Sequence, residues 1–174
     1  MAKLFSEDLE LEFLLCGCYD YHPIQIEFKV TLKWKGIPIL NENAMKRGTD
    51  YWNKGAVGGI VGEEIDNFTL IKDLEEALNN KTTKIWESWP DPDMCISIYP
   101  ETLFPYLNEK DEEYNTIIIS PDTYQLKDCS AYNGYEGISF VLTPDNTNLQ
   151  NFINDLKKEY SDLLIKKEKI KGKK

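Results

Sequence analysis

Two cysteines and the chain's single histidine lie close together near its N-terminus, where they could bind a metal ion or form a reactive thiol. Cys16, Cys18 and His22 fall within seven residues, with Asp20 between them. In an extended strand both thiols would point to one side, and zinc accepts thiolate and imidazole ligands. Structural zinc sites, however, use four ligands and cysteine pairs about two to four residues apart. We therefore favour buried or edge cysteines beside a turn histidine, and keep a small metal-dependent or thiol enzyme using these residues as an alternative.

Other patterns that could carry chemistry are incomplete. The glycine-rich segment 54–64, KGAVGGIVGEE, lacks the Gly-Lys-Ser/Thr of a phosphate loop, and the acids that follow it would repel phosphate. The pairs Glu63/Glu64 and Asp91/Asp93 lack the spacing of a calcium-binding loop. We predict no catalytic residue, no metal site and no cofactor, and interpret the glycine-rich segment as a surface loop that a partner could order.

Aromatic residues next to clustered acids indicate a protein-binding surface, because partner contacts often combine an aromatic anchor with a charged rim. Trp34 falls on the core side of its strand, while Trp86 and Trp89 differ in parity, so only one of that pair can face the core. A small-ligand-binding domain that uses the aromatic residues is a further alternative. The predicted partner-binding residues are Tyr51, Trp52, Glu63, Glu64, Asp66, Trp86, Trp89, Asp91 and Asp93.

Strict alternation of apolar and polar residues predicts the strands that would hold these sites. In IQIEFKVTLKW, residues 24–34, every second residue is apolar, which is typical of a strand that buries one face. Residues 9–15 alternate in the same way, so the two strands predict an antiparallel hairpin. Lys35 and Gly36 predict a tight turn into a third strand at 37–40, which Pro38 restricts to an edge or a short length.

Helical spacing predicts two main helices, at 70–78 and after Thr143, with Pro144 at the first helical position of the second. Further strands are expected at 84–89, 94–99, 114–119 and 138–142, and a short helix at 43–54 and a short strand at 56–61 within the irregular segment 41–67. These elements predict one α+β domain over residues 1–165, with an antiparallel sheet of about five to seven strands and both helices on one face. A lysine-rich tail at 166–174 is expected to fray.

Charge and cysteine use narrow the class of protein. The chain has 174 residues and a net charge of -10, and six of its lysines lie in the tail, so the remainder carries about -15. Such a body disfavours nucleic acid and anionic membrane and favours a basic protein partner, although solubility alone would also explain it. Because no signal peptide or membrane segment is recognisable, we expect a cytoplasmic protein whose four cysteines are free thiols.

In overall profile the chain resembles immunity proteins of bacterial polymorphic toxin and contact-dependent inhibition systems. The segments WESWPDPDMCISIYP, residues 86–100, and EGISFVLTPDNTNLQNFINDLKKEY, residues 136–160, carry this resemblance, without a family motif and without functional residues that could be transferred. The resemblance implies a non-enzymatic inhibitor that binds a basic toxin domain and masks its active site.

Overall fold

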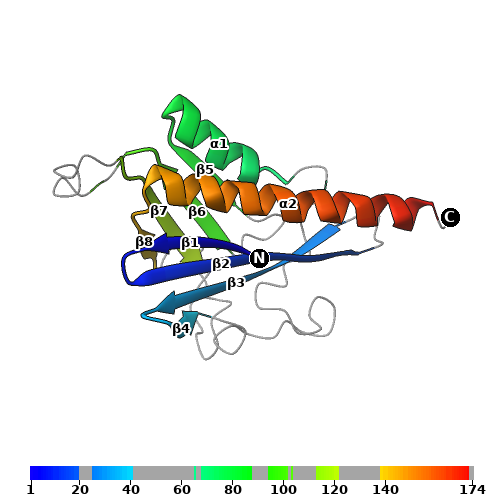
Figure 1. The fold of residues 1–174 in the computed structure, drawn as a ribbon, viewed down its shortest axis with the longest axis horizontal. Helices are drawn as coiled ribbons and strands as arrows, with labels where there is room; N and C mark the ends of the chain where they lie inside the picture. The colour runs from blue at the N-terminus through cyan, green and yellow to red at the C-terminus, as the bar shows by residue number, and fades with distance from the viewer. Residues whose placement is uncertain are drawn as a thin grey trace.

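The computed structural model describes residues 1–19, 25–40, 65, 68–87, 94–101, 103, 113–121 and 138–172, with side chains omitted at 16–19, 25, 27 and 171. Within these ranges the chain forms strands and two helices (Figure 1). In chain order they are β1 (Ala2–Ser6), β2 (Leu9–Tyr19), β3 (Gln25–Trp34), β4 (Ile37–Leu40), α1 (Leu70–Asn80), β5 (Lys84–Glu87), β6 (Met94–Tyr99), β7 (Thr116–Pro121), β8 (Phe140–Leu142) and α2 (Asn146–Lys171).

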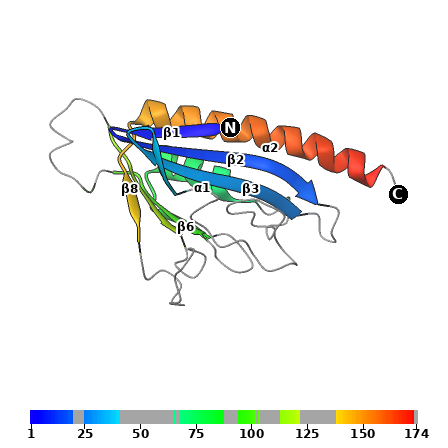
Figure 2. The same cartoon turned by 90° about the horizontal axis from the view of Figure 1, so that it is seen from below.

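The described strands form two antiparallel sheets of four, ordered β1-β2-β3-β4 and β5-β6-β7-β8. The α+β class, the antiparallel pairing and the two helices are thus confirmed, but a single sheet of five to seven strands is not what the described residues form. Each strand pairs with its sequence neighbour, and the chain leaves the first sheet after β4, passing through α1 before β5 begins. Figure 2 shows β1, β2 and β3 side by side along α2, with β6 and β8 running in a different direction.

The alternation in β3 positions the core as predicted, with one correction at its end. Ile26, Phe28, Val30 and Leu32 are all buried, whereas Trp34 is 49% exposed. Trp34 is the last residue of β3 and pairs with Ile37 beside the turn. Parity assigns a residue to a face of the sheet, but Trp34 lies at the end of the strand, where its ring stays exposed.

The two sheets share one hydrophobic core around Trp86 of β5, whose indole ring is 1% exposed. The Trp86 ring lies 6.3 Å from Phe13 of β2, 5.7 Å from Phe28 of β3 and 6.1 Å from Phe68, each measured between centroids and in an edge-on arrangement. Phe13 and Phe28 stack on each other at 4.9 Å across the β2–β3 pair. Aromatic rings from both sheets therefore interlock at the centre of the molecule.

The helices close the core from one side, each over a different sheet. Helix α2 packs against β1 and β2, and α1 packs against β5, β6 and α2 (Figure 1). The α2 stripe is confirmed: Leu149, Phe152, Ile153, Leu156 and Leu163 are buried, and Tyr160 and Leu164 pack against them. A hydrogen bond also joins the first sheet to α2, because Leu15 of β2 donates its backbone N–H to the Glu159 carboxylate at 2.8 Å.

The start of α2 differs from the prediction by two residues. Asp145, not Pro144, precedes the first turn as N-cap, and its Oδ1 accepts the backbone N–H of Asn148 at 2.7 Å. A carboxylate at this position pairs with an otherwise unpaired amide at the helix start, which proline cannot do. At the other end α2 continues through Lys171, so the helix includes most of the segment predicted as a tail. Neither helix in the described ranges is long and apolar enough to cross a membrane.

Ser6 joins the edges of the two sheets. Thr143 donates its backbone N–H to Ser6 Oγ at 2.6 Å, and the two hydroxyls lie 3.1 Å apart. Ser6 is buried at the end of β1, and Thr143 directly follows β8. This contact links strands that are more than a hundred residues apart in sequence but share no backbone ladder.

We expect Ser6→Ala to lower the free energy of unfolding by about 1–3 kcal/mol, because it leaves the Thr143 N–H without its acceptor in a partly buried position. Thr143→Val is the matched control, since it removes a hydroxyl but keeps the N–H donation to Ser6, and it should cost less. Urea denaturation of both variants measures the difference. Equal losses would show that the backbone bond to Ser6 is not what stabilises this junction.

Candidate functional site

Of the nine predicted partner-binding residues, only Trp86 lies within the described residues, and its prediction is wrong. Trp86 is buried among aromatic side chains of both sheets, so it cannot serve as a surface anchor. This agrees with the parity argument that only one of Trp86 and Trp89 faces the core. The other eight lie outside the described residues: Tyr51, Trp52, Glu63, Glu64, Asp66, Trp89, Asp91 and Asp93.

The cysteine and histidine cluster is described only in its backbone. Cys16 and Cys18 belong to β2, and the register with β3 shifts between Leu15 and Gly17, which is typical of a β-bulge. The side chains of both cysteines, and His22 entirely, lie outside the described residues, as do the glycine-rich segment and the short elements expected at 43–54 and 56–61. In the part of the chain that the structure describes, no three His, Cys, Asp or Glu side chains gather closely enough to hold a metal ion.

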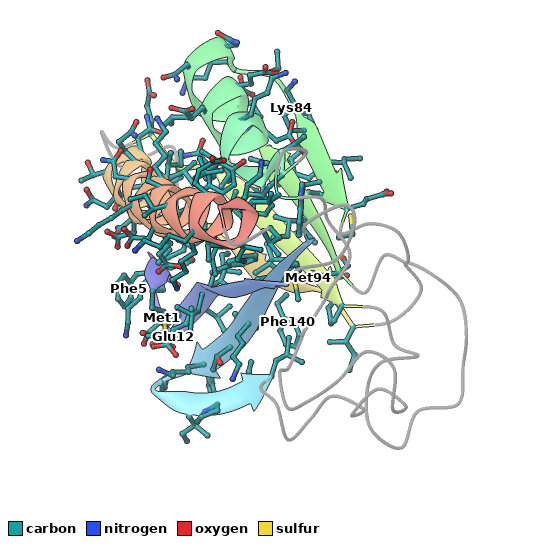
Figure 3. The ribbon with its side chains drawn as sticks, turned by 90° about the vertical axis from the view of Figure 1, so that its right-hand side faces the viewer. Met1, Phe5, Glu12, Lys84, Met94 and Phe140 are labelled. Atoms are coloured by element: carbon teal, nitrogen blue, oxygen red, sulfur yellow. The ribbon has the colours of Figure 1, made fainter. Side chains whose placement is uncertain are left out.

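Paired charges occupy the outer face of the first sheet, on the side away from α2 (Figure 3). Glu12 on β2 lies between Lys3 on β1 and Lys33 on β3, with N–O distances of 2.8 and 2.7 Å. Glu10 shares both lysines, at 2.7 Å from Lys3 and 3.9 Å from Lys33. The register explains this arrangement, because Lys3 lies opposite Glu12 and Glu10 opposite Lys33. The network neutralises its own charges and leaves little for a partner to pair with.

The protonation of Glu12 depends on these lysines. Burial would raise the pKa of its carboxyl, but hydrogen bonds from Lys3 and Lys33 outweigh burial and hold the pKa below its ordinary 4.5. The pKa of Lys3 is raised well above its usual range, by its hydrogen bonds to Glu10 and Glu12. Both pKa shifts favour the charged forms of Glu12 and Lys3, so the outer face of the first sheet is a structural ion-pair network.

A different surface, at the β3–β4 hairpin, exposes large apolar side chains. Trp34 is 49%, Ile37 62% and Ile39 39% exposed. Trp34 and Ile37 are directly opposite each other across the hairpin, so their side chains are neighbours. We call Trp34, Ile37 and Ile39 the hairpin patch. The prediction missed it because Trp34 follows the core parity; the available signal was the apolar sequence IPI on a strand already predicted to be an edge.

The turn that carries the hairpin patch is held in place. Lys35 and Gly36 have φ values of 49° and 80°, the two left-handed residues that a two-residue β-hairpin turn requires. Lys35 donates its backbone N–H to the Asp8 carbonyl at 2.8 Å, and its ammonium lies 3.2 Å from the Asp8 carboxylate. The same ammonium lies 5.3 Å from the centroid of the Trp34 ring, in cation–π contact. The neighbouring β1–β2 turn therefore supports the exposed tryptophan.

Within the described residues β4 is the outermost strand of the first sheet, and its edge is not suited to pairing with another strand. In a two-residue hairpin the first residue after the turn, here Ile37, points its backbone N–H toward the partner strand β3. Successive backbone N–H groups point to opposite sides of a strand, so the nitrogen of Pro38 points away from β3. Proline has no N–H to offer, and the register of β3 with β4 shifts next to it. Both features are known protections of sheet edges. A partner at the hairpin patch would be recognised through side chains rather than by strand addition.

We expect Glu12→Gln to lower the free energy of unfolding by about 1–3 kcal/mol near neutral pH, because two lysines lose their shared carboxylate. The Glu12 pKa is lower in the folded than in the unfolded chain, so this stabilisation is present above pH 4.5 and is lost as the pH falls through the folded pKa. Denaturation at several pH values should show wild type and variant converging in acid. Glu10→Gln, which removes the more peripheral carboxylate, should cost less; an unfolding difference independent of pH would contradict this account.

Comparison with known proteins yields no relative on which a function could rest. No protein-family model matches the chain, and no curated protein or solved structure is significantly similar to it. The functional argument therefore depends on the surfaces described above.

Proposed function

We propose that this protein is a non-enzymatic, protein-binding inhibitor of the immunity type, which binds a basic toxin domain in the cytoplasm and masks its active site. The hairpin patch is the observation that carries this proposal: an exposed tryptophan and two exposed isoleucines on one fixed hairpin of an acidic chain. Tryptophan is among the residues most often found as binding hot spots. Because Lys35 and Asp8 hold the ring in the free protein, little conformational entropy is lost when a partner covers it.

Charge supplies the second part of the argument. The chain carries a net charge of -10, which accelerates the encounter with a basic partner and slows the encounter with an acidic one. The acids Glu63, Glu64, Asp66, Asp91 and Asp93, with Tyr51, Trp52 and Trp89, remain our proposal for further partner contacts. Steering by these charges and apolar contact at the hairpin patch would act on different rate constants, so they can be tested separately.

The function itself is tested by genetic context and by growth. An immunity protein should be encoded directly downstream of a large toxin gene, and co-expression of this chain should restore the growth of cells that express that toxin. An isolated metabolic operon, or a toxin whose effect on growth this chain leaves unchanged, would overturn the proposal.

With the partner in hand, we expect Trp34→Ala to weaken binding by about 2 kcal/mol, or roughly 30-fold, mainly through faster dissociation. Trp34→Ala should also lower stability, because about half of the side chain is buried and it loses its cation–π contact with Lys35, so circular dichroism must show that the variant is folded before binding is compared. Phe5→Ala is the matched control: Phe5 is 46% exposed on the outer face of the same sheet, away from the hairpin patch. Surface plasmon resonance measures both variants. An equal loss with Phe5→Ala, or none with Trp34→Ala, would place the interface elsewhere.

The double charge reversal Glu63→Lys with Glu64→Lys should instead slow association, by about tenfold at low salt, with little change in dissociation. The difference from wild type should shrink as salt is added, because screening removes long-range attraction. Association rates at two salt concentrations measure this. An association rate equal to that of wild type at low salt would show that these two acids do not steer the partner.

A further inference from the structure

The two sheets present outer faces of opposite character. On the first sheet that face carries Lys3, Glu10, Glu12, Lys29 and Lys33. On the second sheet the alternating positions that point away from the core are mostly uncharged. Across β5 to β8 they are Ile85, Glu87, Cys95, Ser97, Tyr99, Thr116, Ile118, Ser120 and Val141, among which Glu87 is the only Asp, Glu, Lys or Arg. Depletion of charge distinguishes the centre of a protein interface from ordinary surface.

One row of this face crosses all four strands in register. Ile85 lies opposite Ser97, Ser97 opposite Ile118, and Ile118 opposite Val141. At the usual distance between strands this row is about 15 Å long. Ile85 is 59% and Val141 37% exposed, so the two ends of the row are open to water. We call these four residues the cross-strand row.

The cross-strand row combines apolar side chains with one small polar residue. Ser97 lies between Ile85 and Ile118 in the register. On one side of the row, exposed Leu103 donates its backbone N–H to Thr116 Oγ1 at 2.9 Å and adds an apolar rim. On the other side Cys95 is buried, with Glu87 opposite it in the register. The exposed surface is therefore a narrow apolar strip with one acid beside it.

Glu87 indicates the charge of the occupant. Its side chain is exposed, and none of the ion pairs among the described residues involves it. By contrast, the acids on the outer face of the first sheet share two lysines. An exposed carboxylate without a cation, next to an apolar strip, is complementary to a segment that combines aliphatic side chains with a lysine or arginine.

We propose that the cross-strand row is a docking surface for a basic protein segment, whose aliphatic side chains contact Ile85 and Val141 and whose cation pairs with Glu87. A second copy of this chain fits less well, because each copy carries a net charge of -10. This surface is distinct from the hairpin patch, so either proposal can fail without the other.

The test uses the full chain and a phage-displayed library of random dodecapeptides. Selected peptides should combine lysine or arginine with aliphatic residues, and their affinity, measured by fluorescence polarisation, should fall at least tenfold with Ile85→Asp and with Glu87→Lys. Ile165→Asp is the matched control: it places the same acid at a similarly exposed isoleucine on α2, outside both proposed surfaces, and it should leave the affinity unchanged. Val141→Asp repeats the test on a different strand in case Ile85→Asp disturbs the fold, which circular dichroism would reveal.

Three results would overturn the proposal. The first is a set of selected peptides without cationic residues. The second is peptide binding that is insensitive to Ile85→Asp and Val141→Asp, or that is lost with Ile165→Asp. The third is a dimer in sedimentation velocity that Ile85→Asp dissociates, since a second copy would then occupy the strip.

Discussion

The fold depends on the contact between Trp86 and the phenylalanines of the opposite sheet. The sheets share no backbone ladder within the described residues, and the edges joined through Ser6 supply only a local link. The Trp86 ring meets Phe13 and Phe28 edge-on, and Phe68 approaches it just before α1 begins. The indole N–H has no hydrogen-bond partner among these residues, an unfavourable feature that the buried area of the ring must outweigh. A smaller residue at position 86 would leave a cavity between the two sheets.

The local pattern of apolar and polar residues was enough to predict most helices and strands. It failed to predict whether a residue is buried where burial depends on residues that are distant in sequence. The alternation in β3 and the stripe of α2 identified buried faces correctly, because each face follows from the residue's own strand or helix. Trp34 has the same parity as Leu32 yet is exposed, because parity does not tell where the neighbouring layer ends. Likewise Glu12 lies on the polar side of β2 but is buried, since lysines of two other strands cover it.

The candidate surfaces were harder to predict than the fold for the same reason. Neither the hairpin patch nor the cross-strand row is a sequence motif; the row joins Ile85 to Val141 only through the register of four strands. Trp86 was predicted to bind a partner because a tryptophan next to clustered acids is typical of a binding anchor. A tryptophan is also a common core residue, and the local sequence does not distinguish the two roles. Its burial in contact with rings from β2 and β3 could be known only once the sheets were placed together.

The charged and uncharged outer faces bear in different ways on self-association and on the partner binding that we propose. Cross-strand ion pairs on the first sheet leave few groups for a partner to bind, and Pro38 with the register shift protects the β4 edge. Among the described residues, exposed apolar side chains are spread over several elements, since Phe5 on β1 and Ile165 on α2 are 46% and 56% exposed in addition to the hairpin patch and the cross-strand row. The like charge of two copies opposes their association, whereas the basic partner that we propose would meet no such repulsion.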